Sequence, residues 1–248
     1  MFTVDVLVLM GFAGFLAAVL HSLTGFGGAL FLATMLTPLI GIRYAVPVTT
    51  AAMIVANASR IHAFRHDIPW RVVAVILPAA VPGIIIGAIL FVGMAEHLIS
   101  LLIGSYLICA VIARRLVRGT RPVGRGALGA ASAVYGLVGG VSFGAGLILA
   151  PFLLGAGIAG AQLVATVAVA GFVLNGLKSL VFGWSEAFGP AVLWAGALVG
   201  LCAVPGTYLG RWLLHRLASG VHTWLLEAML VVMGVWLVTE GVRTATGT

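Results

Sequence analysis

The segment Phe26-Gly27-Gly28-Ala29-Leu30-Phe31-Leu32-Ala33 (residues 26–33) recurs later in the chain as Phe143-Gly144-Ala145-Gly146-Leu147-Ile148-Leu149-Ala150 (residues 143–150). In both copies a glycine-rich break leads directly into an apolar run. Glycine adopts backbone conformations that other residues avoid, so dense glycines interrupt a helix and let the chain turn tightly. The recurrence indicates a duplicated unit in which an apolar helix begins just after each break.

Two further motifs recur in the same order along the chain. An amide one helical turn before a cation occurs as Asn57-x-x-Arg60 and again as Asn175-x-x-Lys178. A Val-Pro-Gly-x-x-x-Gly motif occurs at residues 81–87 and again at residues 204–210. Internal similarity of this kind is the sequence signature of repeated architecture. We therefore predict two homologous halves, residues 1–115 and 126–248, joined by a basic cytoplasmic loop at residues 116–125.

The composition places both halves in a membrane. The chain has 248 residues, of which 62% are hydrophobic and only 8% charged, against about 25% charged residues in an ordinary soluble domain. No Asp, Glu, Lys or Arg occurs in residues 6–42, 72–95, 126–177 or 187–210. About 20 apolar residues suffice to cross a bilayer as a helix. A soluble globular protein is thereby excluded.

Charges, prolines and glycines divide the chain into ten apolar segments, five in each half. Helix is the expected state, because an open sheet edge in lipid leaves backbone groups unpaired. The sequence therefore predicts an all-α polytopic integral membrane protein. The segments are approximately 4–22, 26–41, 44–64, 70–93, 97–113, 126–141, 144–158, 161–182, 188–210 and 221–239.

The relative orientation of the halves depends on segments 26–41 and 144–158, which are short for a membrane span. As re-entrant hairpins or thin spans they give an odd number of crossings per half and an inverted repeat, whereas one broken span gives parallel halves. The distribution of basic residues fits both topologies equally well under the positive-inside rule. We favour the inverted repeat, because short glycine-interrupted segments at equivalent places typify inverted-repeat transporters.

The net charge of +7 is explained by membrane topology and does not require a nucleic-acid partner. Five arginines gather near residues 114–125, as expected of a cytoplasmic loop. The apolar start of the chain is typical of a retained membrane segment. Cys109 and Cys202 lie in apolar segments, and no motif predicts a metal site or a cofactor.

The two glycine breaks are the first candidate binding site. Helices that restart near Gly28 and Gly146 would present free N–H groups and positive dipole ends to the gap, which suits an anion. Gly-mediated helix packing is the competing interpretation. The candidate residues at the breaks are Ser22, Thr24, Gly25, Phe26, Gly27, Gly28, Ser142, Phe143, Gly144, Ala145 and Gly146.

Asn57, Arg60, Asn175 and Lys178 are the second candidate site. An amide beside a cation on one helix face supplies both donors and positive charge for an oxyanion. Snorkelling of the long side chains to the interface is the alternative. His21, just before the first break, is a candidate for coupling transport to protons.

The two Val-Pro-Gly motifs suggest hinges at Pro82, Gly83, Pro205 and Gly206. Proline removes a helical hydrogen bond and kinks the helix. A kink that only shapes helix packing is the alternative.

The glycine break, its echo Ser142-Phe143-Gly144-Ala145-Gly146 and the paired Val-Pro-Gly helices around a basic loop resemble the TauE/SafE sulfite exporter family, also called the 4-toluene sulfonate uptake permeases. The resemblance extends from about Val8 to Val238. It implies a secondary transporter of small sulfur-containing anions, such as sulfite, sulfoacetate or related sulfonates, in a bacterial plasma membrane. Thr34 stands where the second half has Pro151, so the first copy departs from a proline-bearing pattern.

Other functions fit the sequence less well. Gly140-Val141-Ser142-Phe143-Gly144 matches the G-x-S-x-G motif of hydrolases, but a nucleophile elbow needs a preceding strand, and duplication explains the glycines. We therefore do not expect an enzyme. A gated anion channel or a membrane scaffold is the alternative function. Paired breaks in two repeats favour alternating access around a midplane anion site over an open pore.

Overall fold

The computed structural model describes residues 3–24, 27–116, 123–143, 145–183, 189–214, 216 and 221–246. Over these residues the chain forms ten α-helices and a short 3-10 helix, η1 (Arg65–Asp67). The first half contains α1 (Val4–Thr24), α2 (Gly28–Ile40), α3 (Ile42–Ala63), α4 (Trp70–Gly93) and α5 (Glu96–Leu116). The second half contains α6 (Arg125–Val141), α7 (Gly146–Gly155), α8 (Gly160–Phe182), α9 (Pro190–Leu214) and α10 (Val221–Thr246). The prediction of an all-helical chain is confirmed.

Each predicted apolar segment corresponds to one helix, and the two short segments form the shortest α-helices of the described chain. α2 has 13 residues and α7 has 10, which at 1.5 Å per residue gives lengths of about 20 and 15 Å. Both are shorter than the roughly 30 Å hydrocarbon core of a bilayer. At the other extreme, α10 continues to Thr246, past its predicted end at residue 239.

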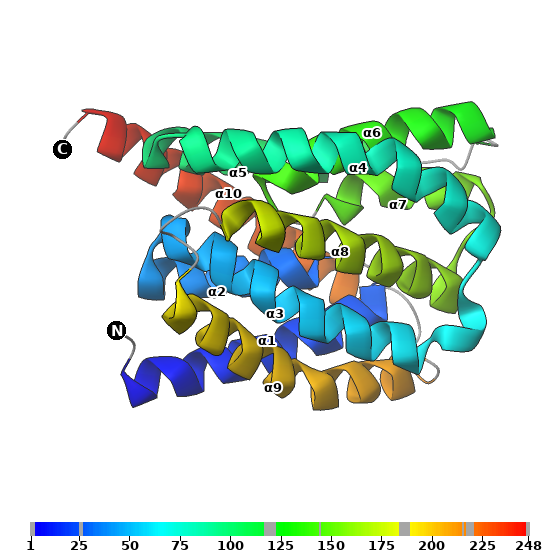
Figure 1. Ribbon diagram of the computed structural model, residues 1–248, viewed down its shortest axis with the longest axis horizontal. Coiled ribbons are helices and arrows are strands. Elements are labelled where there is room, and N and C mark those ends of the chain that lie inside the picture. Colours follow the sequence, from blue (N-terminus) through cyan, green and yellow to red (C-terminus); the bar gives the residue numbers. More distant parts are fainter. Residues whose placement is uncertain are drawn as a thin grey trace.

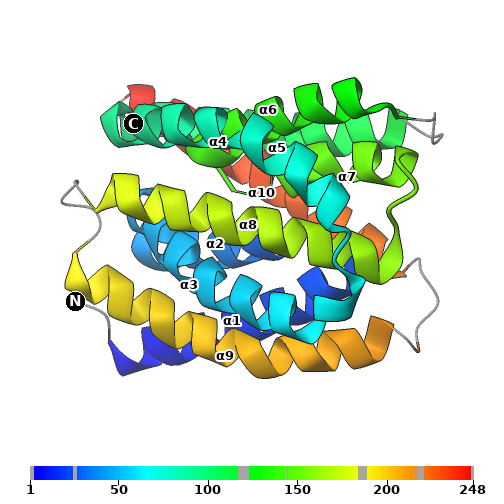
Figure 2. The ribbon, with the colours of Figure 1, turned by 45° about the vertical axis from the view of Figure 1, so that its right-hand side comes forward.

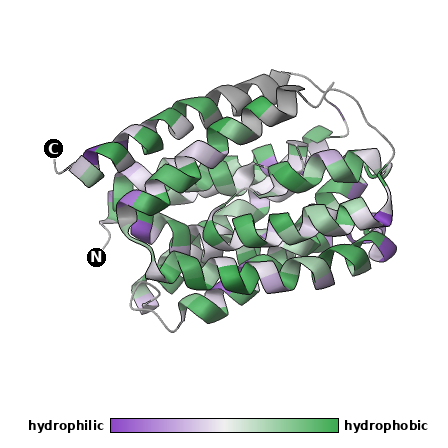
Figure 3. Cartoon of the chain, turned by 90° about the horizontal axis from the view of Figure 1, so that it is seen from above, coloured by the Kyte–Doolittle hydropathy of each residue, from purple (hydrophilic) through white to green (hydrophobic). Residues whose placement is uncertain are grey.

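The helices carry the surface of an integral membrane protein. Four of them, α1, α4, α8 and α9, are long and apolar enough to cross a bilayer. Large apolar side chains face outward along their length, among them Leu180 with 69% and Trp194 with 78% of the side chain exposed. Figure 3 shows hydrophobic residues along the middle of the helices and hydrophilic residues mainly toward their ends. Water would make such a surface unstable, whereas lipid covers it favourably.

α3 and α8 lie at the centre of the molecule. In both Figure 1 and Figure 2, α1 and α9 form one side, α4, α5 and α6 form the other, and α3 and α8 run between them. α3 packs against α8 and α9, and α8 packs against α3 and α4. This central pair carries the two Asn-x-x-cation motifs, so the fold brings the motifs of the two halves together.

The Val-Pro-Gly motifs join each half to the other. A Cβ at Gly87 of α4 would collide with the backbone of Leu137 and Gly140 in α6, and one at Gly210 of α9 would lie 2.7 Å from the carbonyl of Val19 in α1. Such close approach of backbones is the usual role of small residues in membrane helices. Both helices run unbroken through Pro82 and Pro205. The packing role is thus observed, while the hinge role of Pro82, Gly83, Pro205 and Gly206 stays a prediction.

Two pairs of corresponding helices, α5 with α10 and α3 with α8, run in opposite directions. Gly104 of α5 lies against Gly234 of α10, while His97, earlier in α5, lies against the later Gly241. α5 and α10 are therefore antiparallel. In Figure 1, α3 runs from left to right along the sequence colours and α8 from right to left.

Candidate functional site

The helices are interrupted at the two places that the sequence predicts. α1 ends at Thr24 and α2 begins at Gly28, while α6 ends at Val141 and α7 begins at Gly146. Gly27 caps α2 in the left-handed conformation, with φ of 87°, which a residue with a Cβ rarely adopts. The helices thus restart at the two predicted glycines.

Both restarted helices begin without a side-chain cap. The N-cap residues are Gly27 for α2 and Ala145 for α7, and neither has a side-chain oxygen that could accept a hydrogen bond from the first helical turn. The first N–H groups of a helix have no partner inside it and carry a partial positive charge. The starts of α2 and α7 thus have the chemical character of an anion site.

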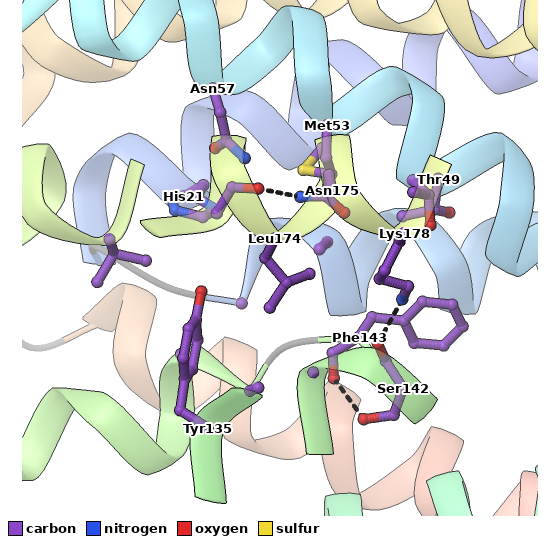
Figure 4. A pocket seen from close by; sticks show the side chains of 18 residues that line it. His21, Thr49, Met53, Asn57, Tyr135, Ser142, Phe143, Leu174, Asn175 and Lys178 are labelled. Atoms are coloured by element: carbon purple, nitrogen blue, oxygen red, sulfur yellow. Dashed lines mark hydrogen bonds between the residues drawn. The ribbon is translucent and has the colours of Figure 1, made fainter. Parts of the chain in front are cut away.

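A cavity of about 50 Å³ lies between the two breaks and the central helices α3 and α8 (Figure 4). One water needs at least about 10–15 Å³ on this measure, so the cavity holds about three to five groups of that size. This volume suits a small oxyanion. The predicted residues that line it are His21, Gly27, Asn57, Ser142, Phe143, Ala145, Gly146, Asn175 and Lys178.

Lys178 brings a buried positive charge to the cavity. Its side chain is 1% exposed, and its Nζ donates a hydrogen bond of 2.9 Å to the carbonyl oxygen of Ser142 in the second break. The ammonium also lies 5.5 Å from the ring centre of Phe182, a favourable cation–π distance. Among the buried residues that the structure describes there is no Asp or Glu. An ammonium buried without a counter-ion is costly, so an anion in the cavity would stabilise the charged form of Lys178.

Arg60 lies behind the cavity wall. The guanidinium is fully buried, and its Nη1 donates a hydrogen bond of 2.7 Å to Oδ1 of Asn57, which lines the cavity. In the second half the corresponding amide bonds elsewhere, because Nδ2 of Asn175 donates to the carbonyl of Gly171 at 2.6 Å. The two Asn-x-x-cation motifs have the same spacing but make different contacts.

The remaining predicted residues near the first break differ in their positions. His21 lines the cavity, and both of its ring nitrogens are buried without a hydrogen-bond partner. The hydroxyl of Thr24 donates back to the carbonyl of Leu20 at 2.8 Å. Ser22 and Gly28 are buried outside the cavity lining, with Ser22 against Gly210 of α9 and Gly28 against His21. Gly25, Phe26 and Gly144 lie outside the described residues.

The structure adds cavity residues that the motifs do not contain, notably Thr49, Met53, Tyr135, Gly171 and Leu174. On α3, Thr49 and Met53 precede Asn57 at four-residue steps, which places them on the same helix face. Gly171 precedes Asn175 by the same step on α8. Extending the helical spacing backward from each asparagine would have found them, whereas Tyr135 of α6 enters through tertiary packing alone.

Comparison with known proteins identifies one family. The family model described as Sulfite exporter TauE/SafE matches residues 10–237, a span that includes all of the cavity residues. Comparisons with curated proteins and with solved structures gave no match.

Proposed function

The chain belongs to the sulfite exporter TauE/SafE family, and on this premise we propose that it is a secondary transporter of small sulfur-containing anions in a bacterial plasma membrane. The substrates we propose are sulfite, sulfoacetate or related sulfonates. The membrane-protein surface and the family are consistent with this function. The proposal assigns the cavity between the two helix breaks as the substrate site.

The observation that carries the proposal is the charge of this cavity. Lys178 lines it with a buried ammonium, and the described buried residues include no carboxylate to neutralise that charge. The cavity also lies beside the uncapped starts of α2 and α7, with Gly27 and Gly146 in its lining. A buried cavity with these groups stabilises an anion and repels a cation.

Alternating access around this cavity is the transport mechanism that we propose. The antiparallel courses of α5 and α10 and of α3 and α8 support an inverted repeat of residues 1–115 and 126–248. Inverted-repeat transporters bind substrate at the interface of the repeats, beside discontinuous helices. Rocking of the halves, with bending near Pro82-Gly83 and Pro205-Gly206, would open the cavity to each side in turn.

The contacts of Ser142 argue against hydrolysis at this site. Its hydroxyl donates to the carbonyl of Val138 at 2.8 Å, as serines in membrane helices commonly do. A nucleophilic serine needs a base within hydrogen-bond reach. The G-x-S-x-G match is therefore better explained by the helix break than by catalysis.

A binding panel on the detergent-purified protein tests the proposal. Ligands that bind only the folded state raise the apparent melting temperature. We expect sulfite, methanesulfonate or sulfoacetate to stabilise the protein, and choline to leave it unchanged. The Lys178→Gln variant should lose the response, whereas Arg125→Gln, at the exposed start of α6, should keep it. Absence of any anion response in the wild type would contradict the proposed function.

A further inference from the structure

The guanidinium of Arg60 has one edge paired and one edge free. Nη1 bonds to Asn57, while Nε and Nη2 are buried and have no hydrogen-bond partner. Buried donors without partners are rare in proteins, because each loses its hydrogen bonds to water and gains none. The free edge therefore calls for a ligand.

The geometry of this edge restricts the class of ligand. Nε–H and Nη2–H lie in one plane and point in the same direction, so they match two oxygens of a single oxyanion. A spherical halide offers one acceptor and cannot use the pair equally well. The ammonium of Lys178, which already donates to the Ser142 carbonyl, is a point charge without such a fork.

A second unpaired group stands near this edge. His21 lines the cavity with Asn57, and neither of its ring nitrogens has a partner. Asn57 also accepts the hydrogen bond from Nη1 of Arg60, so the guanidinium lies directly behind this part of the cavity wall. Figure 4 shows His21 and Asn57 on one side of the cavity and Lys178 on the other. The unpaired groups of α1 and α3, His21 in the lining and Arg60 behind Asn57, thus lie on the side away from Lys178.

We propose that Arg60, through its Nε–Nη2 edge and with His21 nearby, determines selectivity for oxyanions, while Lys178 supplies charge that attracts any small anion. The inference rests on the proposed function for the identity of the oxyanion as a sulfur compound. It assigns different roles to two residues that occupy equivalent places in the repeat.

Isothermal titration of the full-length purified protein with methanesulfonate and with bromide separates the two roles. In wild type we expect methanesulfonate to bind more tightly than bromide. Arg60→Lys should weaken methanesulfonate binding by about 10- to 100-fold, the loss expected for a hydrogen bond to a charged group, and should abolish the preference. Lys178→Gln should weaken both anions by similar factors. The control is Arg211→Lys in α9, where the guanidinium lies over the ring of Phe64 just after α3; it should behave as wild type.

Each outcome bears on the proposal. Unchanged preference in a folded Arg60→Lys variant would overturn it, and so would equal affinity of the wild type for bromide and methanesulfonate, a result that needs no variant. A wild type that binds acetate through Arg60 but no sulfur oxyanion would refute the proposed function and leave the Arg60 inference standing.

Discussion

Replacing Gly171 with alanine should weaken anion binding through a displacement of Asn57. Gly171 of α8 faces Asn57 of α3, and an added Cβ would lie 2.8 Å from Nδ2 and 3.4 Å from Cγ of the asparagine. Since contacts this short do not occur, the amide must move. Oδ1 of that amide accepts the 2.7 Å hydrogen bond from Arg60, so the methyl group disturbs the group that holds the guanidinium in place.

The size of the effect follows from that hydrogen bond. A hydrogen bond to a charged group contributes about 1.5–3 kcal/mol, and each 1.4 kcal/mol changes affinity about tenfold. We therefore expect Gly171→Ala to raise the Kd for methanesulfonate by about 10- to 100-fold. Alanine also favours helix over glycine by up to about 1 kcal/mol, so the variant should remain folded.

Gly176→Ala is the matched control for this prediction. It lies on the same helix, and a Cβ there would meet no atom within 4 Å. The gain in helix propensity is the same in both variants, so it cancels in the comparison. Isothermal titration should show wild-type affinity for Gly176→Ala. Equal affinities of the two variants would refute the coupling of Gly171 through Asn57 to Arg60.

Three further predictions concern packing, chemistry and topology. Gly87→Ala should lower the melting temperature by about 2–12 °C, because overpacking costs about 1–3 kcal/mol. Gly93→Ala, whose added Cβ would meet no atom within 4 Å, should leave the melting temperature unchanged. Circular dichroism in detergent measures both. Ser142→Ala should keep anion binding within about tenfold of wild type, since Lys178 uses the Ser142 backbone carbonyl and the lost hydroxyl bond is worth only about 0.5–1.5 kcal/mol. Complete loss of binding in titration would count against this site. In a background without Cys109 and Cys202, Gly126→Cys and Pro190→Cys should react with a membrane-impermeant maleimide from opposite sides of the membrane. The reason is that α6 and α9 begin at opposite ends of the bundle (Figure 1). Labelling of both cysteines from the same side would contradict these opposite starts of α6 and α9.

Local patterns predicted the helices and their breaks because both depend on nearby residues. Runs of apolar residues set the helix lengths, and the glycines at 27 and 146 set where α2 and α7 begin. In the structure, predicted residues from both halves line one cavity. His21, Asn57, Asn175 and Lys178 all line it.

The sequence could not distinguish the two cations or complete the cavity. Arg60 and Lys178 follow asparagines at the same spacing, yet Arg60 bonds to Asn57 and Lys178 reaches across to the break at Ser142. These partners depend on how helices pack, which a linear motif does not record. Tyr135 joins the cavity for the same reason, because the packing of α6 places it there.

Transport of ³⁵S-labelled sulfite into proteoliposomes tests the central claim most directly. With wild-type protein and with Gly176→Ala, preloaded unlabelled sulfite should drive accumulation of the label well above that in empty liposomes. Lys178→Gln, reconstituted at the same density, should reduce the initial rate by about tenfold or more, since it removes the buried charge that lines the cavity. Exchange at the wild-type rate by Lys178→Gln, or no wild-type flux above the empty control, would contradict a sulfur-anion site between the two helix breaks.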